Sequence, residues 1–193
     1  QGFQDRSSDP YRTIRLKATP LLKDKVRSVR TAAAQVCAQI PRENLSIKQS
    51  RDLDKCIEEL KLGVLVNNDR AAAHLTLGTV YERLGDFQRA EESYRTAIRV
   101  ERGATGPRAN LATLLENRIQ GAGQAMQQMR DPAELANLQE QLGTWSEEIK
   151  ILRAQELVHF ERDAGYAPQN ASVQYRYGLA LYRVGEMEKA TEY

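Results

Sequence analysis

The side chains best suited to metal binding, haem attachment or nucleophilic catalysis are few in this sequence, and their spacing does not connect them. Cys37 and Cys56 form no C-x-x-C pair, and no His follows either one at the spacing that attaches haem. His74 and His159 have no Ser, Cys or carboxylate arrangement that implies catalysis. No G-x-G-x-x-G or P-loop pattern occurs. We therefore predict no catalytic residue, no metal site and no cofactor within this chain, and we do not expect it to be an enzyme.

The two Cys residues have a structural interpretation instead. Free Cys is among the most buried residue types, so we expect Cys37 and Cys56 to be small buried residues on helices. A disulfide between them remains open as an alternative, and it would require an oxidising compartment.

The composition is that of a folded protein without a membrane helix. Hydrophobic residues make up 41% of the chain, charged residues make up 28%, and the formal net charge is +2. No apolar run approaches the roughly 18 residues that indicate a membrane span. Basic residues concentrate in residues 1–30, which hold eight Lys or Arg against three Asp. This segment could contact phosphates, but only Phe3 and Tyr11 are available to stack on bases, so we expect a solvated face or an interdomain contact.

The most regular pattern lies in residues 71–104. The residues that carry it are Leu77, Gly78, Tyr81, Ala90 and Tyr94. Their spacing resembles the L-G-x2-Y and A-x3-F parts of the tetratricopeptide (TPR) repeat, whose period is about 34 residues. His74 replaces the usual Trp, and Arg102 replaces the closing Pro. The resemblance implies a first helix over about 70–83, a turn at 84–86 and a second helix over about 87–101.

The same resemblance assigns structural roles within residues 71–104. Gly78 is expected where the two helices cross closely, because a side chain there would push them apart. Gly85 belongs to the turn between them. The residues expected to fill the crossing are Tyr81, Ala90, Tyr94 and Ala97.

Two segments precede this repeat. Residues 1–8 are polar, and we predict a disordered arm. Residues 9–41 contain D-P-Y-R-T-I-R-L-K-A and D-K-V-R-S-V-R-T-A-A, which resemble the helices of HEAT repeats. In such helices the Arg extends along the surface beside a buried apolar residue. A helix is predicted over about 25–40 and ended by Pro41, with an apolar stripe of Val26, Val29, Ala33, Val36, Cys37 and Ile40.

Residues 42–70 are predicted to form one helix of a degenerate TPR-like unit, over about 46–66. Its apolar face is formed by Leu53, Ile57, Leu60 and Val64. Asn67, Asn68 and Asp69 then end this helix and cap the next one.

Residues 105–170 are predicted to be an expanded TPR-like unit that contains an inserted segment at 119–146. Thr105 or Gly106 caps its first helix, and Pro107 lies in the first turn. Whether residues 119–131 form a helix or a loop is open. Thr144-x-x-Glu147 reads as a capping box that starts a long helix to about Ala164, with Trp145 packed at that start.

Residues 171–193 repeat the pattern of residues 71–93 at a constant offset of 100, and we predict a truncated TPR repeat there. Tyr177-Gly178, Leu181, Val184-Gly185, Met187 and Ala190 correspond to Leu77-Gly78, Tyr81, Leu84-Gly85, Phe87 and Ala90. The predicted fold class is therefore all-α, an α-solenoid of antiparallel helix pairs that are HEAT-like first and TPR-like afterwards.

A TPR array binds its partners in a concave groove lined by the first helix of each repeat. By this resemblance the groove would carry Leu75, Thr79, Glu82, Asn110, Thr113, Asn117 and Arg176. An ordinary solvated helix surface is the alternative interpretation of these residues.

One mode in the family clamps a C-terminal carboxylate with Lys, Asn and Arg side chains. Asn110 and Arg176 match this mode, whereas Leu75, Thr79 and Ser172 stand where Lys, Asn and Lys would be. Loss of both Lys positions removes most of the charge that captures a carboxylate. We therefore expect a partner other than an acidic C-terminal tail.

The order of these segments resembles the C-terminal HEAT–TPR region of some bacterial multihaem c-type cytochromes. The chain begins at Gln1 and stops at Tyr193 within a helical pattern, so we expect a piece of a longer protein. The resemblance implies a periplasmic or extracellular location, with haem outside this chain.

Our leading prediction of function is a non-catalytic scaffold that binds another protein or a neighbouring domain. A self-assembling module that forms oligomers or filaments is the alternative, because solenoid ends expose apolar surface unless they are capped. Nucleic-acid binding through the basic N-terminal segment ranks third.

Overall fold

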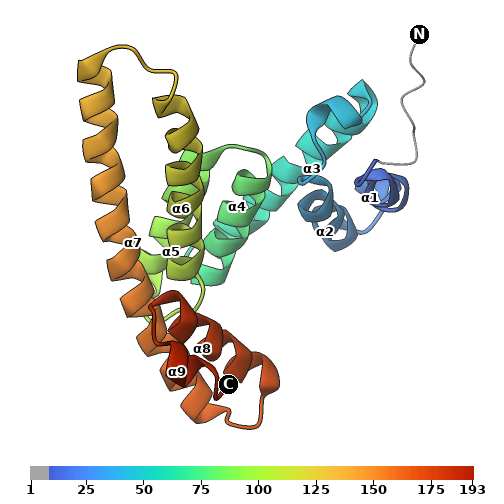
Figure 1. Cartoon of the computed structure of the whole chain (residues 1–193). Coiled ribbons are helices and arrows are strands. Elements are labelled where there is room, and N and C mark those ends of the chain that lie inside the picture. The colour runs from blue at the N-terminus through green and yellow to red at the C-terminus, as the bar shows by residue number, and fades with distance from the viewer. Residues whose placement is uncertain (1–8) are drawn as a thin grey trace. The chain divides into compact units, whose positions relative to one another are not determined.

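The structure is a computed structural model that describes residues 9–193, apart from the side chains of Leu65 and Gln124. The predicted disordered arm, residues 1–8, lies outside these residues. Helices and their connections make up the described chain, and none of its residues lies in a strand (Figure 1). The predicted all-α class is confirmed.

The chain divides into two compact units. Of the described residues, 9–68 and 76–90 form the first unit, and 69–75 and 91–193 form the second. The division passes through α4 (Ala71–Arg83) and α5 (Phe87–Val100), so each of these helices contributes to both units. Their bounds agree with the predicted ranges of about 70–83 and 87–101.

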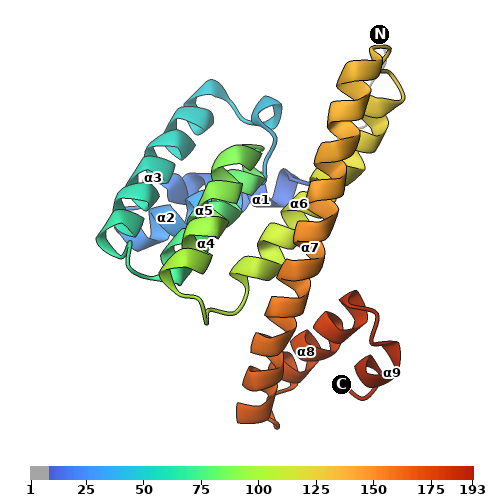
Figure 2. The same cartoon turned by 90° about the vertical axis from the view of Figure 1, so that its left-hand side faces the viewer.

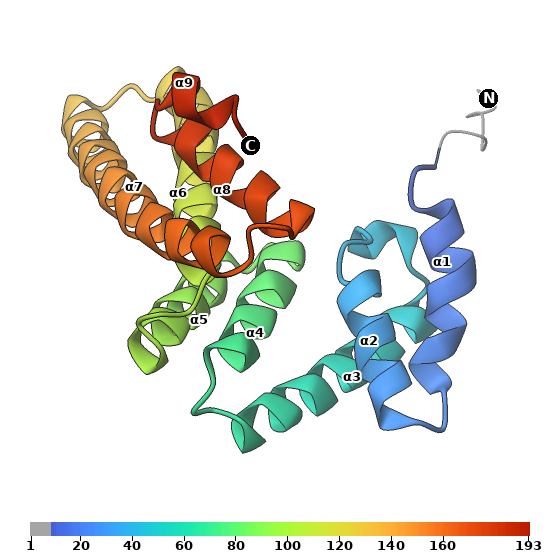
Figure 3. The ribbon, with the colours of Figure 1, turned by 90° about the horizontal axis from the view of Figure 1, so that it is seen from below.

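The first unit is built around α2 and α3. Its elements are α1 (Arg12–Ala18), the 3₁₀ helix η2 (Thr19–Lys23), α2 (Arg27–Cys37), the 3₁₀ helix η3 (Arg42–Asn44) and α3 (Ile47–Val66). Figure 3 shows α1 beside α2, and α2 packs against α3. Their shared core includes Ala34, Cys37, Leu53 and Cys56.

Helix α3 agrees with its prediction, whereas α2 differs from it. A capping box of Ser46 and Gln49 starts α3, and its four predicted apolar residues are all buried. Helix α2 ends at Cys37, short of the predicted residue 40, and Val26 has an extended backbone outside the helix. Val26 and Val36 are exposed. The predicted stripe is therefore only partly a core face, because Val26 lies before the helix and Val36 is exposed within it.

The second unit contains two long helices that lie side by side. Figures 1 and 2 show α6 (Pro107–Met126) antiparallel to α7 (Pro132–Tyr166), and α8 (Ala171–Arg183) packs against the C-terminal part of α7. The short α9 (Met187–Ala190) packs on α8. A small core cluster between α7 and α8 contains Phe160, Ala164, Tyr177 and Leu181.

The predicted start of the long helix at Thr144 is wrong. Helix α7 starts at Pro132, where the Asp131 side chain accepts a hydrogen bond from the Ala133 N–H at 2.8 Å. Thr144 lies inside the helix, and its hydroxyl donates to the Glu140 carbonyl. Asp at the N-cap followed by Pro in the first turn is itself a signal for a helix start. The helix therefore begins there, before the chain reaches the Thr-x-x-Glu pattern. Residues 119–126, which the sequence left open, continue α6 as a helix.

The turns after α4 and α8 share one hydrogen-bond pattern. Gly85 and Gly185 have φ of 76° and 89°, which favours glycine. The Asp86 N–H donates to the Tyr81 carbonyl at 2.9 Å, and the Glu186 N–H donates to the Leu181 carbonyl at 3.0 Å. Both turns are Schellman motifs. The predicted offset of 100 residues therefore holds at the level of backbone hydrogen bonds.

Candidate functional site

A cavity in the second unit is the feature best suited to bind a partner. It has a volume of about 290 Å³ and lies between the start of α6, the C-terminal half of α7, and α8. We refer to it as the α6–α8 cavity. Its apolar lining consists of Gly106, Ala109, Phe160, Leu179 and Ala180. Its polar lining consists of Asn110, Arg153, Glu156, Arg176 and Arg183.

Helical spacing brings these residues to one place. Arg153, Glu156 and Phe160 are three and four residues apart, so they share one face of α7. On α8 the spacing of Arg176, Ala180 and Arg183 likewise puts them on one face. One face of α7 and one face of α8 thus form two sides of the cavity, and the first turn of α6 forms the third.

Arg153 is buried and fully paired. Its side chain is 7% exposed, and its guanidinium donates to Glu116 at 2.9 Å and to the Thr113 hydroxyl at 2.9 Å. It also donates to the Ala109 carbonyl at 3.3 Å. Because these partners all lie on α6, Arg153 joins α7 to α6 and brings no unpaired charge to the cavity.

Glu156 is buried with half of its carboxylate unpaired. It is 2% exposed, and its Oε1 accepts a hydrogen bond from the Gly106 N–H at the start of α6. Its Oε2 has no hydrogen-bond partner among residues 9–193. Burial raises the pKa of Glu156, and this is opposed by the Gly106 N–H and by the charges of Arg108 and Arg153.

Other contacts hold the residues before α6 against α7. The Thr105 hydroxyl donates to Asp163 Oδ2 at 2.6 Å, and Arg162 donates to the Gly103 carbonyl at 3.3 Å. Burial alone would raise the pKa of Asp163, but the hydrogen bonds from Thr105 and Arg162 outweigh it and lower that pKa. Burial also lowers the pKa of His159 on α7, which favours a neutral imidazole.

Arg176 and Arg183 form a cationic rim on the α6–α8 cavity. Both side chains are exposed, and neither forms an ion pair with any residue in the described part of the chain. Arg176 donates to the Ser172 carbonyl of its own helix at 3.3 Å, and its charge contributes to the lowered pKa of Asp163. These two guanidinium groups therefore remain available to an anion from outside.

The structure brings together only part of the predicted groove. Asn110 and Arg176 line the α6–α8 cavity. Thr113 instead holds Arg153, and Asn117 is exposed on α6. Leu75 is half-buried near Gly106, since a Cβ atom added to Gly106 would lie 3.6 Å from Leu75 Cδ2. The remaining two, Thr79 and Glu82, are half-buried residues of the first unit.

Sequence reasoning missed the α7 residues and Arg183. The groove was predicted only on the first helices of repeats, which leaves out α7, and on α8 it included Arg176 but not Arg183. The detectable signal was Arg153, Glu156 and Phe160, which combine charges with an apolar residue on one helix face.

The predicted structural residues are mostly buried. Ala90, Tyr94 and Ala97 are fully buried, and Gly78 is buried as well. Leu77 is half-buried. Tyr81 is half-buried between the cations of Lys61 and Arg89, which lie 5.4 and 5.7 Å from its ring centre. A Cβ at Gly178 would lie 2.9 Å from Tyr193 Cβ, so a larger residue there would displace the C-terminal turn.

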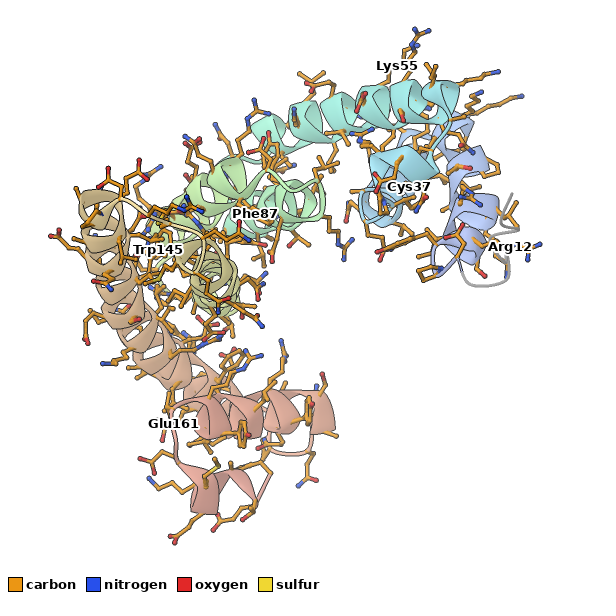
Figure 4. The ribbon with its side chains drawn as sticks, turned by 45° about the horizontal axis from the view of Figure 1, so that its top comes forward. Arg12, Cys37, Lys55, Phe87, Trp145 and Glu161 are labelled. Carbon is orange, nitrogen blue, oxygen red and sulfur yellow. The ribbon has the colours of Figure 1, made fainter. Side chains whose placement is uncertain are left out.

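Trp145 packs in the interior of α7, and the prediction that it marks a helix start is wrong. The Arg118 guanidinium of α6 stacks over its ring at 4.3 Å, and Figure 4 shows Trp145 among the side chains between these helices. Arg118 also pairs with Glu91, which pairs with Arg95, and Arg95 reaches Glu148 on α7. This chain of charges joins α5, α6 and α7.

Both Cys residues are buried and free, as the structural interpretation expects. Burial raises the pKa of Cys37 to about 11, and the Cys56 thiol donates to the Leu22 carbonyl at 3.2 Å. Among residues 9–193 no three His, Cys, Asp or Glu side chains gather as metal ligands. No helix of the described chain is both long enough and apolar enough to cross a membrane.

Comparison with known proteins identifies one segment. The family model of the tetratricopeptide repeat matches residues 71–104, the range predicted from the spacing of Leu77, Gly78, Tyr81, Ala90 and Tyr94. No curated protein matches the sequence significantly. The match agrees with the helix pair α4 and α5 and the Schellman turn between them. Residues 71–104 are therefore a tetratricopeptide repeat.

Proposed function

We propose that this chain is a scaffold that binds a segment of another protein in the α6–α8 cavity. TPR repeats mediate protein–protein interactions, which supports the class of function. The observation that carries the site is the cavity itself, because a concave, mostly apolar surface with a few convergent polar groups is the usual form of a binding site.

A peptide selection tests this proposal. The purified chain is used to select binders from a library of short random peptides, and their affinities are then measured by titration calorimetry. Ala180→Phe fills the cavity and should abolish binding of the selected peptides, because Ala180 lines it. Asn110→Ala, which adds no bulk, should weaken binding.

The matched control is Ala154→Phe, which adds the same bulk at an exposed position of α7 away from the cavity. This variant should bind as the unchanged chain does. Circular dichroism verifies that each variant is folded. A library that yields no specific binder, or binders indifferent to Ala180→Phe and Asn110→Ala, would contradict the proposal.

Self-assembly is the second candidate, and an apolar hollow on α8 and α9 favours it. The hollow has a volume of about 350 Å³ and is lined by Tyr175, Tyr182, Met187 and Tyr193 among others. Tyr175 and Tyr182 are 65% and 56% exposed. Sedimentation over a range of concentrations tests this candidate, and a monomer at every concentration would eliminate it.

Nucleic-acid binding remains the third candidate, with less support. Three of the N-terminal cations already form ion pairs within the first unit, namely Arg15 with Asp9, Lys23 with Asp52 and Arg30 with Glu59. Binding through phosphates would weaken steeply with salt, so salt-independent DNA binding would contradict it.

The proposal that this chain belongs to a longer exported protein with haem rests on the resemblance to multihaem cytochromes alone. A Soret band in the longer protein would support that proposal, and the absence of such a band would refute it.

A further inference from the structure

The geometry points to an internal acidic segment as the ligand of the α6–α8 cavity: one apolar side chain enters the cavity, and a neighbouring Asp or Glu pairs with Arg176 and Arg183 at the rim. This inference rests on the proposed function, since it specifies the partner of the same site.

The apolar side chain follows from the inner surface of the cavity. Phe160 and Leu179 contribute the largest apolar side chains, with Ala109 and Ala180 beside them. A volume of about 290 Å³ is large enough for one Leu or Phe side chain and too small for a folded element. Removal of such a side chain from water supplies the main favourable free energy of binding.

The acidic neighbour follows from the balance of charge at the rim. Arg153 already pairs with Glu116, so it attracts no further anion. Arg176 and Arg183 are both exposed. They are seven residues apart, which places them on the same face of α8. Neither forms an ion pair with any of residues 9–193. A carboxylate placed between them and above Leu179 would gain two charge-assisted hydrogen bonds.

An anion should stay at the rim and out of the depth of the cavity. Glu156 lines the cavity, and its Oε2 is buried without a partner, so a second carboxylate beside it would meet a like charge or an unsatisfied acceptor. The neutral side chain therefore takes the inner position. An internal acidic residue fits this arrangement, because its carboxylate can stay at the rim while a neighbouring apolar side chain enters the cavity. A terminal carboxylate that had to be enclosed in the cavity would fit it less well.

The experiment uses capped synthetic peptides derived from the selection described above, with acetylated and amidated ends. We expect selected peptides to carry Asp or Glu next to Leu, Ile or Phe. Replacing that acid by its amide should weaken binding severalfold. The double variant Arg176→Glu with Arg183→Glu should weaken it roughly tenfold, because rim charges tune affinity modestly. An uncapped C-terminus should bring no gain.

The matched control is Arg130→Glu, a charge reversal at an exposed residue outside the cavity. It should leave affinity unchanged, which separates local pairing from a general effect of net charge. Arg176 and Arg183 are exposed, so the variants should stay folded. If the double variant does not fold, the milder Arg183→Gln variant gives a second measurement.

The outcomes separate the two proposals. Selected peptides without acidic residues, or acidic peptides that bind equally to the Arg176→Glu, Arg183→Glu variant, would overturn this inference and leave the proposed function standing. A gain of tenfold or more from a free C-terminus would also overturn it, in favour of a terminal carboxylate. A library that yields no binder at all would refute the proposed function and this inference together.

Discussion

Two charged side chains of α7 are buried three residues apart, and they differ in how well they are paired. Arg153 has a carboxylate, a hydroxyl and a carbonyl as partners, whereas Glu156 satisfies only one oxygen. A buried charge without full pairing costs stability, because desolvation is not repaid. The ionised form of Glu156 therefore contributes unfavourably to folding.

The variant Glu156→Gln should raise the free energy of unfolding at pH 7 by about 1 kcal/mol, because it keeps the acceptor for Gly106 and removes the buried charge. Since the folded state raises the pKa of Glu156 above its ordinary value of 4.5, ionisation penalises the folded state once the pH exceeds that value. Below about pH 4.5 the carboxyl is neutral in both states, and the advantage of the variant should vanish.

Urea unfolding at neutral and acid pH measures this difference. Glu161→Gln, at an exposed position of the same helix, should change stability little at either pH. Figure 4 shows Glu161 near the C-terminal end of α7. An advantage of Glu156→Gln that grows as the pH falls would contradict the assignment.

Local sequence signals predicted the helices well and the contacts between helices poorly. The apolar face of α3 was predicted in full, because periodicity within one helix is a local property. The start of α7 was wrong, because two cap signals compete and Asp131 with Pro132 prevails. Pairing of Arg153 with Glu116 spans 37 residues, and no spacing rule predicts such a contact.

Gly85 and Gly165 differ in backbone conformation. Gly85 has φ of 76° at the Schellman turn, and Gly165 lies in the last turn of α7 with a negative φ. Neither has atoms that an added Cβ would meet within 4 Å. Gly85→Ala should lower the free energy of unfolding by about 1 kcal/mol from backbone strain. Gly165→Ala should raise it by about 0.5 kcal/mol through helix propensity.

Urea midpoints of the two variants provide the measurement. Opposite signs are expected, and since both sites are exposed, packing does not obscure the comparison. Equal effects at both positions would mean that the turn after α4 does not hold the conformation described here.

The identified repeat and the proposed site occupy different residues of the chain. The family model covers residues 71–104, whereas the α6–α8 cavity is lined by residues from Gly106 to Arg183. A groove predicted from the repeat alone therefore contains Leu75, Thr79 and Glu82 and none of the residues that line the cavity. A sequence pattern identifies the regular unit, while the binding surface depends on how irregular helices pack against one another.

Hydrogen exchange of the full chain, with and without a saturating selected peptide, directly tests binding in the α6–α8 cavity. We predict that the peptide slows amide exchange at the start of α6, in α7 near residues 153–160 and in α8 near residues 176–183. The protection should disappear in the Ala180→Phe variant. Protection confined to the first unit, or slowed exchange at α8 that persists in Ala180→Phe, would contradict binding of the partner in the α6–α8 cavity.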